Sequence, residues 1–301
     1  MYKVRLYQTV RSGRGKEQKT VTKNKKYYMS ELMNQLKETV NFIRSKVDMQ
    51  AKVGIILGSG LGNLTEEIEV DTSIPYAEIP HFPVSTVKGH SGKLLFGKLN
   101  GKNVIVMGGR FHYYEGYTSQ QVVYPVRVMR LLGVETLLLS NAAGGINPDF
   151  KVGDLMVIKD HISFFTANPL IGKNEDELGT RFPDMSEPYC KKYIAKAHEV
   201  AKANNIKLYE GIYAGVTGPT FETHAEYRVI KTLGGDAVGM STVQENIAAN
   251  HCGIKVFGIS VITDIGVRDD DNTITHEEVL QAAKSAEPKM ALIFKELISS
   301  L

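Results

Sequence analysis

The sequence has little cysteine and no long apolar run. Cys190 and Cys252 are the only cysteines among 301 residues, and they form no C-x-x-C pair. The sequence therefore predicts neither a disulfide framework nor a cysteine metal site. We expect both thiols to be packing residues in a reducing, cytoplasmic compartment. No apolar run approaches the roughly 18 to 20 residues that a membrane helix needs, so no membrane span is expected.

The sequence also lacks the two common nucleotide-binding loops. Residues 58–62, G-S-G-L-G, follow the apolar run 53–57. Their spacing is one residue short of the G-x-G-x-x-G dinucleotide fingerprint, and no Gly-Lys-Ser/Thr follows, which disfavours a nicotinamide dehydrogenase and a Walker loop. Glycines after a strand nevertheless let backbone N–H groups approach an anion. We therefore favour a phosphate loop that uses the Ser59 hydroxyl, with a plain tight turn as the alternative.

Acidic residues are almost absent from the first 28 residues. This segment holds nine Lys or Arg and only Glu17, a net charge of +8, so the total of +3 leaves −5 for the remainder. A nucleic-acid-binding arm or a basic transit peptide would explain such a tail. We favour an extension that is disordered or not native, because Met29-Ser30-Glu31 reads as a natural start. The domain is then residues 29–301, and no nucleic-acid partner is expected.

The apolar pattern of residues 29–301 predicts one α/β domain. With 43% hydrophobic and 23% charged residues, the composition is that of an ordinary globular protein. Helical spacing begins at Ser30, a suitable N-cap, and Asn100-Gly101 predicts a type I′ hairpin turn after a strand from Lys93. Further strands are predicted at 53–57, 103–107, 137–140, 155–158, 207–216, 236–241 and 255–263, and helices from 30, 122, 188, 225 and 276.

Arginine and histidine follow the apolar strand 103–107 directly. Two glycines end that strand, and Arg110, His112 and Tyr114 come next, with Arg110 and His112 on one side of an extended segment. Arginine grips phosphate in a bidentate manner, and strand ends are where open α/β sheets bind ligands. The stretch therefore predicts an anion site, against the alternative of a surface loop with chance charges.

Other loops and strand ends also carry groups that could meet a ligand. Asp264 follows the apolar strand 255–263, where a carboxylate needs a partner. Glu222 lies in the turn G-P-T-F-E-T, where it either accepts a hydrogen bond from the N–H of a heterocycle or caps the following helix. Phe164 and Phe165 in a loop predict an interface or a base-stacking wall, with simple loop packing as the alternative.

Six segments together resemble the purine nucleoside phosphorylase family, in its low-molecular-mass, homotrimeric branch. They are G-S-G-L-G at 58–62, F-P-V-S-T-V-x-G-H at 82–90, G-R-F-H-Y-Y-E-G-Y at 109–117, N-A-A-G-G at 141–145, G-P-T-F-E-T at 218–223 and G-M-S-T-V at 239–243. The resemblance extends from about Ser30 to the C-terminus. It implies an α/β domain whose mixed central sheet is partly closed into a barrel and flanked by helices.

The resemblance also implies an activity, which is the cleavage of purine nucleosides by phosphate without metal or organic cofactor. Phosphate would be held by Ser59, Arg110, His112, Asn141, the backbone N–H of Ala142, and Ser241. The nucleoside would contact Tyr114, Tyr213, Phe221, Glu222, Met240, Thr263, Asp264 and His276. The catalytic residues would be Glu222, Asp264 and His112. Phe164 would enter the site of a neighbouring subunit of a homotrimer.

Two positions depart from the family's pattern. Asp264 stands where the family usually has Asn, whose amide can both donate and accept a hydrogen bond. An ionised Asp only accepts, which suits the amino group of adenine or a protonated N7. We therefore expect inosine and guanosine to remain favoured, with adenosine tolerated more than is usual. Gln244 replaces a proline in the pattern Val-Pro-Glu, and we treat it as a loop change without a predicted effect.

Two other functions stay open. The related methylthioadenosine phosphorylases carry Asp at the position of Asp264 and use 6-aminopurines, although Met240-Ser241-Thr242 and His276 resemble the enzyme for ordinary nucleosides. A non-catalytic nucleoside- or phosphate-binding protein is the other alternative. The complete phosphate set and Glu222 argue against it.

Overall fold

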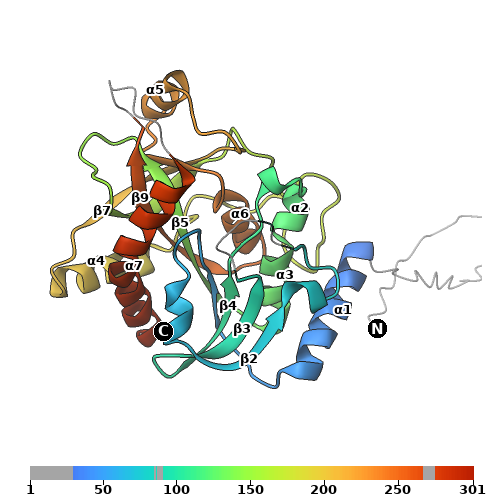
Figure 1. The fold of residues 1–301 in the computed structure, drawn as a ribbon. Helices are drawn as coiled ribbons and strands as arrows, with labels where there is room; N and C mark the ends of the chain where they lie inside the picture. Colours follow the sequence, from blue (N-terminus) through green and yellow to red (C-terminus); the bar gives the residue numbers. More distant parts are fainter. Residues whose placement is uncertain (1–29, 85, 87–90, 267–274) are drawn as a thin grey trace, which may run out of the picture.

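The fold is known from a computed structural model, which describes residues 30–84, 86, 91–266 and 275–301. The predicted extension 1–28 and most of the second half of the 82–90 segment lie outside the described residues. Within them the chain forms one α/β unit in which a single mixed sheet runs through the middle (Figure 1).

Nine strands form this sheet in the order β2-β3-β4-β1-β5-β8-β7-β6-β9. β1 lies parallel to β4 on one side and to β5 on the other, whereas β2, β3 and β4 form an antiparallel meander. The strands are β1 (Val53–Ile56), β2 (Glu69–Pro75), β3 (Lys93–Leu99), β4 (Lys102–Gly108), β5 (Thr136–Gly145), β6 (Leu155–Ile162), β7 (Leu208–Gly215), β8 (Ala237–Gly239) and β9 (Lys255–Ile265).

The second half of the sheet closes on itself. β9, at the end of the order, also pairs with β5 in parallel, from Thr136↔Lys255 to Gly145↔Ile265. The pairs β5–β8, β8–β7, β7–β6, β6–β9 and β9–β5 therefore form a ring of five strands. Because this is the partly closed barrel that the sequence predicted, the fold class is confirmed. β5 belongs both to the ring and to the open part of the sheet.

Helices cover the sheet on both sides (Figure 1). α7 packs against β9 and α4, whereas α3 packs against α1 and α6, and α6 also contacts β9. The helices are α1 (Glu31–Lys46), α2 (Ser119–Val122), α3 (Tyr124–Leu132), α4 (Lys191–Ala203), α5 (His224–Thr232), α6 (Val243–His251) and α7 (His276–Ser299). Short 3-10 turns are η1 (Asn63–Glu67), η2 (Tyr76–Glu78) and η3 (Tyr113–Glu115).

Local sequence signals account for several element boundaries. The Ser30 hydroxyl accepts from the Met33 backbone N–H at 3.1 Å, so Ser30 is the N-cap of α1 as predicted. Asn100 and Gly101 both have positive φ, +48° and +74°, in the predicted hairpin turn between β3 and β4. Gly133 ends α3 in the left-handed conformation.

Two predictions about elements were wrong. β5 does not end at Ser140 but continues to Gly145, because β9 pairs with it along that whole length. Gln244 does not lie in a loop, since it is the second residue of α6 and is buried. Helical periodicity does not reveal α6 in the sequence, because this helix is almost entirely buried and its polar residues do not gather on one face.

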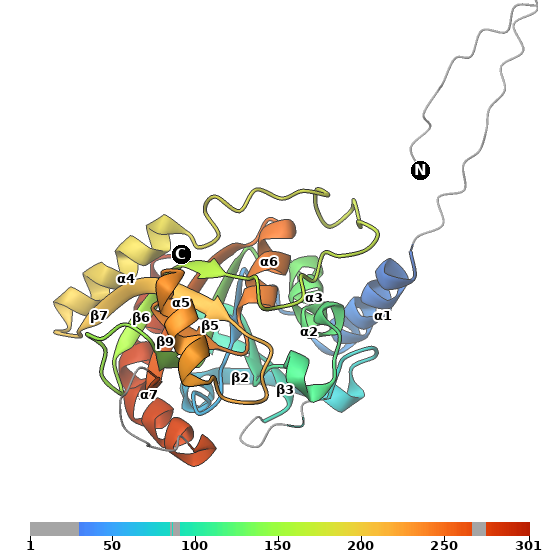
Figure 2. The ribbon, with the colours of Figure 1, turned by 90° about the horizontal axis from the view of Figure 1, so that it is seen from above.

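A long connection leads from β6 to α4. Figure 2 shows it crossing the top of the molecule to reach α2 and α3 before it returns to α4. The Gln120 side chain in α2 donates to the carbonyl of Ile171 in this connection at 3.0 Å. Phe164 and Phe182 lie on it and are 83% and 86% exposed, respectively. The connection therefore presents two aromatic side chains, Phe164 and Phe182, that are largely exposed to solvent in the single chain.

Candidate active site

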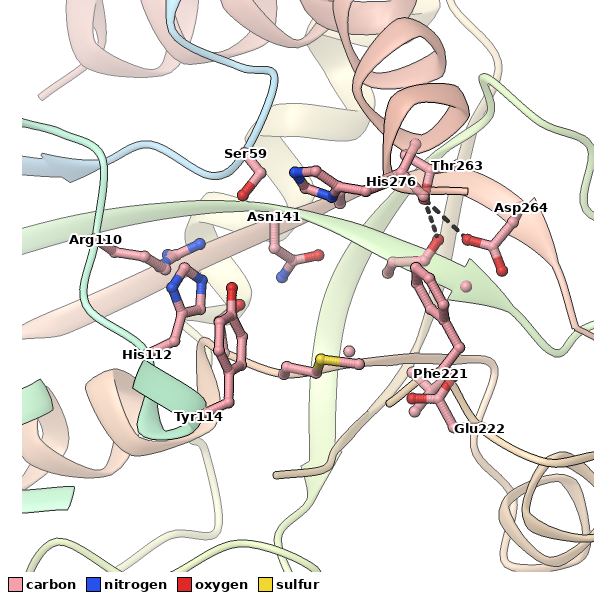
Figure 3. A pocket seen from close by; sticks show the side chains of 18 residues that line it. Ser59, Arg110, His112, Tyr114, Asn141, Phe221, Glu222, Thr263, Asp264 and His276 are labelled. Carbon is pink, nitrogen blue, oxygen red and sulfur yellow. Dashed lines mark hydrogen bonds between the residues drawn. The ribbon is translucent and has the colours of Figure 1, made fainter. Parts of the chain in front are cut away.

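A cavity opens where the ends of β1, β4, β5, β8 and β9 meet the start of α7. Its volume is about 660 Å³, including the mouth that is open to solvent. Figure 3 shows Ser59, Arg110, His112 and Asn141 towards one end, and Phe221, Glu222 and Asp264 towards the other. Its lining is Ser59, Arg110, His112, Tyr114, Asn141, Ala142, Ala143, Gly144, Phe221, Glu222, Val238, Gly239, Met240, Ser241, Thr263, Asp264, His276 and Val279.

All but two of the predicted site residues line this cavity. Tyr213 is fully buried behind the wall, where its hydroxyl oxygen accepts from the backbone N–H of Ser241 at 3.4 Å. Phe164 lies on the exposed connection and does not line the cavity of its own chain. Segments that are far apart in the sequence are brought together because β5 pairs with β1, β8 and β9.

The glycine turn after β1 is pressed against β5. A Cβ on Gly58 would lie 2.8 Å from the Ser140 carbonyl oxygen and from the Asn141 Cα, so no larger residue fits without a shift. The Gly58 backbone N–H also donates to the Ser140 hydroxyl at 3.2 Å. This close approach brings Ser59 to the same cavity wall as Asn141.

Arg110 is a buried cation, 1% exposed, between two acceptors. Its Nε donates to Glu245 Oε1 at 3.0 Å and its Nη1 to the Ser140 carbonyl at 2.6 Å. Bonds to two different nitrogens fix the plane of the guanidinium, which lines the cavity. This end of the cavity thus has a fixed positive group beside the hydroxyls of Ser59 and Ser241.

His112 is held by the carboxylate of Glu115. Glu115 Oε1 accepts from the His112 backbone N–H at 2.8 Å and lies 3.1 Å from His112 Nδ1. Burial alone would raise the pKa of Glu115, but hydrogen bonds from His112 and Thr86 lower it to about 2. Burial lowers the pKa of His112, against the opposing effect of the Glu115 hydrogen bond. The Tyr114 ring stacks on the imidazole, with 4.6 Å between the ring centres.

The opposite end of the cavity carries two carboxylates. Asp264 Oδ1 accepts from the Thr263 hydroxyl at 3.0 Å. A Cβ on Gly144 would lie 2.9 Å from Asp264 Oδ2, so the carboxylate occupies space that only glycine leaves open. Burial raises the pKa of Glu222, and the charge of Asp264 raises it further. Acceptors therefore gather here, with the Phe221 ring, which is 42% exposed, beside them.

Sequence reasoning missed the residues that hold the cavity side chains from behind. Glu115 follows His112 by three positions, and Glu245 follows Thr242 by three. That spacing is typical of a capping box, in which the later carboxylate accepts from the earlier backbone N–H, and both pairs have this geometry. The sequence signature was therefore present for Thr242 and Glu245, although it says nothing about Arg110, whereas His112 is not a usual N-cap residue and gave no such signal for Glu115. Ala143, Gly144 and Gly239 lie in segments that carry the family resemblance but were not named as site residues, and Val238 and Val279 gave no signal.

The described residues also bear on a metal site and on a membrane span. Within them, no group of three or more His, Cys, Asp or Glu side chains is placed to hold a metal ion. None of the helices described is both long and apolar enough to cross a membrane. The expectation that no cofactor is needed stays a prediction.

Comparison with known proteins points to one family. The family model described as "Phosphorylase superfamily" matches residues 52–299. "Purine nucleoside phosphorylase 1" of Geobacillus stearothermophilus is 48% identical, over 88% of this chain and 97% of its own length. "Purine nucleoside phosphorylase" of Bos taurus is 48% identical, over 88% and 94%. A crystal structure of Schistosoma mansoni purine nucleoside phosphorylase with adenosine is 42% identical, with a TM-score of 0.85 over 89% and 98% of the chains.

Proposed function

The chain belongs to the purine nucleoside phosphorylase family, and from this premise we propose that it cleaves purine ribonucleosides and deoxyribonucleosides with inorganic phosphate. The products are the free base and ribose or deoxyribose 1-phosphate. One observation carries the proposal, which is that a single cavity joins an arginine, histidine and serine end to a carboxylate and phenylalanine end. An anion and a purine fit these two ends, with room for a sugar between them.

We assign phosphate to the end that holds Arg110. The cation and the hydroxyls of Ser59 and Ser241 are donors suited to phosphate oxygens, and all three line the cavity there. His112 and the backbone N–H of Ala142 after Asn141 complete the proposed set. Because Glu115 holds the imidazole, His112 has a fixed orientation towards the anion.

We assign the nucleoside to the rest of the cavity. The sugar contacts Tyr114, Met240 and His276, with Tyr213 acting through Ser241 from behind the wall. The base stacks near Phe221 and is held by Glu222, Thr263 and Asp264. The Glu222 carboxylate, when ionised, accepts a hydrogen bond from N1–H of a 6-oxopurine such as hypoxanthine or guanine.

The proposed reaction is a displacement at the sugar C1′. A phosphate oxygen forms a bond to C1′ as the bond from C1′ to N9 breaks, with inversion, and the bonding pair leaves with the purine. Positive charge develops on the sugar, where the phosphate dianion stabilises it, and negative charge develops on the base. A proton taken up from solvent at N7 neutralises that charge, and the ionised Asp264 carboxylate accepts a hydrogen bond from the resulting N7–H.

Base preference depends on Asp264. Its carboxylate accepts from the adenine amino group but offers no donor to the O6 of hypoxanthine or guanine. We expect inosine and guanosine to stay favoured, adenosine to be turned over, and Asp264→Asn to lower kcat/KM for adenosine relative to inosine. The measurement is kcat/KM for inosine, guanosine, adenosine and methylthioadenosine in both proteins. Undetectable adenosine turnover, with an unchanged order of preference in the variant, contradicts this role.

The oligomer and the compartment complete the proposal. The chain works as a homotrimer in which the exposed Phe164 ring enters the cavity of a neighbour. The free thiols of Cys190 and Cys252 suit a reducing, cytoplasmic compartment.

The proposed function is tested by incubating the full chain with inosine and following hypoxanthine release as phosphate is titrated. We expect turnover that saturates with phosphate and stops without it. Turnover of methylthioadenosine far above that of inosine would instead favour a methylthioadenosine phosphorylase. Binding of inosine and phosphate without any turnover would favour a non-catalytic binding protein.

A further inference from the structure

Glu245 stands behind the cavity rather than in it. It is 2% exposed, and it is not among the residues that line the cavity. Its Oε1 accepts from Nε of the buried Arg110 at 3.0 Å. Nη1 of the same guanidinium donates to the carbonyl of Ser140 in β5 at 2.6 Å. The direction in which Arg110 faces the cavity is therefore set jointly by Glu245 and β5.

The second carboxylate oxygen holds a strained residue. Glu245 Oε2 accepts from the Thr242 backbone N–H at 3.0 Å. Thr242 has φ +72° and ψ −46°, a conformation that is a clear outlier for a β-branched side chain. Such a backbone persists only where its surroundings enforce it, and it concentrates at functional sites. Thr242 is fully buried and directly precedes α6, in which Glu245 is the third residue.

The Thr242 hydroxyl then reaches two residues of the cavity wall. Thr242 Oγ1 accepts from Asn141 Nδ2 at 2.9 Å and lies 3.1 Å from the Ser241 hydroxyl. A continuous set of bonds thus runs from Arg110 through Glu245 to Thr242, and on to Asn141 and Ser241. Figure 3 shows Arg110 and Asn141 on the same side of the cavity.

We propose that Glu245 is the positioning residue that holds Arg110, Asn141 and Ser241 as one phosphate-binding unit, an inference that rests on the proposed function. The role requires two acceptor oxygens, because Glu245 meets one N–H on each side. A Gln offers one carbonyl oxygen and one NH2, so it would face a donor with a donor on one of the two sides. It would also leave the buried Arg110 without its carboxylate.

If Glu245 only stabilised the fold, its substitution would lower Tm without a specific change in KM for phosphate. Asp236 provides the comparison, because it also uses both oxygens, one towards the Asn147 side chain and one towards the Ile212 backbone N–H, each at 2.9 Å. Asp236 does not line the cavity. Removing its charge should cost stability without a specific effect on phosphate.

The experiment compares Glu245→Gln, Asp236→Asn and the unchanged full chain. We measure KM for phosphate, KM for inosine, and the rise in Tm that added phosphate produces. In E245Q we expect KM for phosphate to increase by about tenfold or more and the phosphate-induced rise in Tm to be lost, with KM for inosine changed much less. In D236N we expect a lower Tm with the phosphate response intact.

Four outcomes contradict the inference or the function on which it rests. An unchanged KM for phosphate in folded E245Q, or equal changes in both KM values, contradicts it. If E245Q does not fold, Thr242→Val tests the same bonds from the hydroxyl end, and an unchanged phosphate response there also contradicts it. If the unchanged chain turns over no nucleoside, the proposed function fails, while the phosphate-induced rise in Tm still tests the positioning role.

Discussion

At the scale of single residues, the site depends on how closely side chains and backbone can approach. Gly144 is the clearest case, because a Cβ there would lie 2.9 Å from Asp264 Oδ2, 3.4 Å from Val238 Cγ1 and 3.5 Å from the Tyr227 hydroxyl. The Asp264 carboxylate can therefore occupy its position only because Gly144 on the facing strand has no Cβ. β5 and β9 pair Gly144 directly with Asp264.

Gly144→Ala should therefore act on the base end of the cavity. We expect it to displace the Asp264 carboxylate, raise KM for nucleosides, leave KM for phosphate nearly unchanged, and cost about 1–3 kcal/mol of stability through overpacking. The measurements are both KM values and urea unfolding. Gly62→Ala is the matched control, because a Cβ there meets nothing within 4 Å. Equal effects of the two substitutions on KM for nucleosides would contradict this account.

At the scale of elements, β5 organises both the sheet and the site. It pairs with β1, β8 and β9, it offers the Ser140 carbonyl to Arg110, and it lines the cavity with Asn141 and Ala142. The β3–β4 hairpin delivers Arg110 just beyond its end. The register of the β3–β4 pair therefore determines where Arg110 lies, whereas the turn between the two strands contributes to the stability of the fold.

The hairpin turn gives a prediction that isolates backbone strain. Gly101 has φ +74°, and a Cβ there would meet nothing within 4 Å. The cost of Gly101→Ala therefore comes only from placing a non-glycine residue in the left-handed conformation. We expect the substitution to lower the free energy of unfolding by about 1–2 kcal/mol. Gly62→Ala, equally uncrowded and without positive φ, should change it little. Denaturant unfolding of both variants decides, and equal effects would rule out strain as the cause.

Local chemistry made most of the elements predictable, and long-range pairing set the rest. Ser30 and Asn100-Gly101 behave as their sequence implies, because capping and turn geometry involve only neighbours. The strand that holds Asn141 was predicted too short, because small residues there read as a turn, whereas pairing with β9 keeps them extended. The role of Glu245 was also missed because it depends on a long-range contact, since its partner Arg110 lies 135 positions away.

At the scale of the whole molecule, closure of the ring partly buries His161 of β6. His161 in β6 has its Nδ1 3.2 Å from the Tyr189 hydroxyl. Burial lowers the pKa of His161 from 6.5 to about 4, although the charge of Asp160 opposes the shift. The unfolded chain therefore binds a proton between these two values that the folded chain does not.

This difference predicts how stability depends on pH. The free energy of unfolding is unaffected by His161 above pH 6.5. It falls as the pH is lowered from 6.5 towards 4, with a slope of at most about 1.4 kcal/mol per pH unit, because the unfolded chain binds the proton first. His161→Gln should flatten the slope in that window. His198, whose side chain is 39% exposed, serves as the control, and His198→Gln should leave the slope in place. Urea unfolding across the window provides the measurement, and an unchanged slope in H161Q would contradict the assignment.

The proposed trimer predicts that two different inactive variants restore activity when their subunits are mixed. Arg110→Ala should abolish the site of its own subunit, and Phe164→Ala should weaken the site of a neighbour. Refolding the two variants together should restore activity above the sum of the separate proteins, because mixed trimers hold an intact site beside an intact Phe164. Absence of any gain, in mixtures shown to exchange subunits, would argue against the shared site.

The central claim is that one anion bound beside Arg110 attacks the sugar. The most direct measurement is combined ³¹P and ¹H NMR of the full chain with inosine and inorganic phosphate, because hypoxanthine and ribose contain no phosphorus. We predict that ribose 1-phosphate appears in step with hypoxanthine as inorganic phosphate is consumed, and that Arg110→Ala loses both signals together. Release of hypoxanthine with free ribose and no loss of phosphate would contradict the claim.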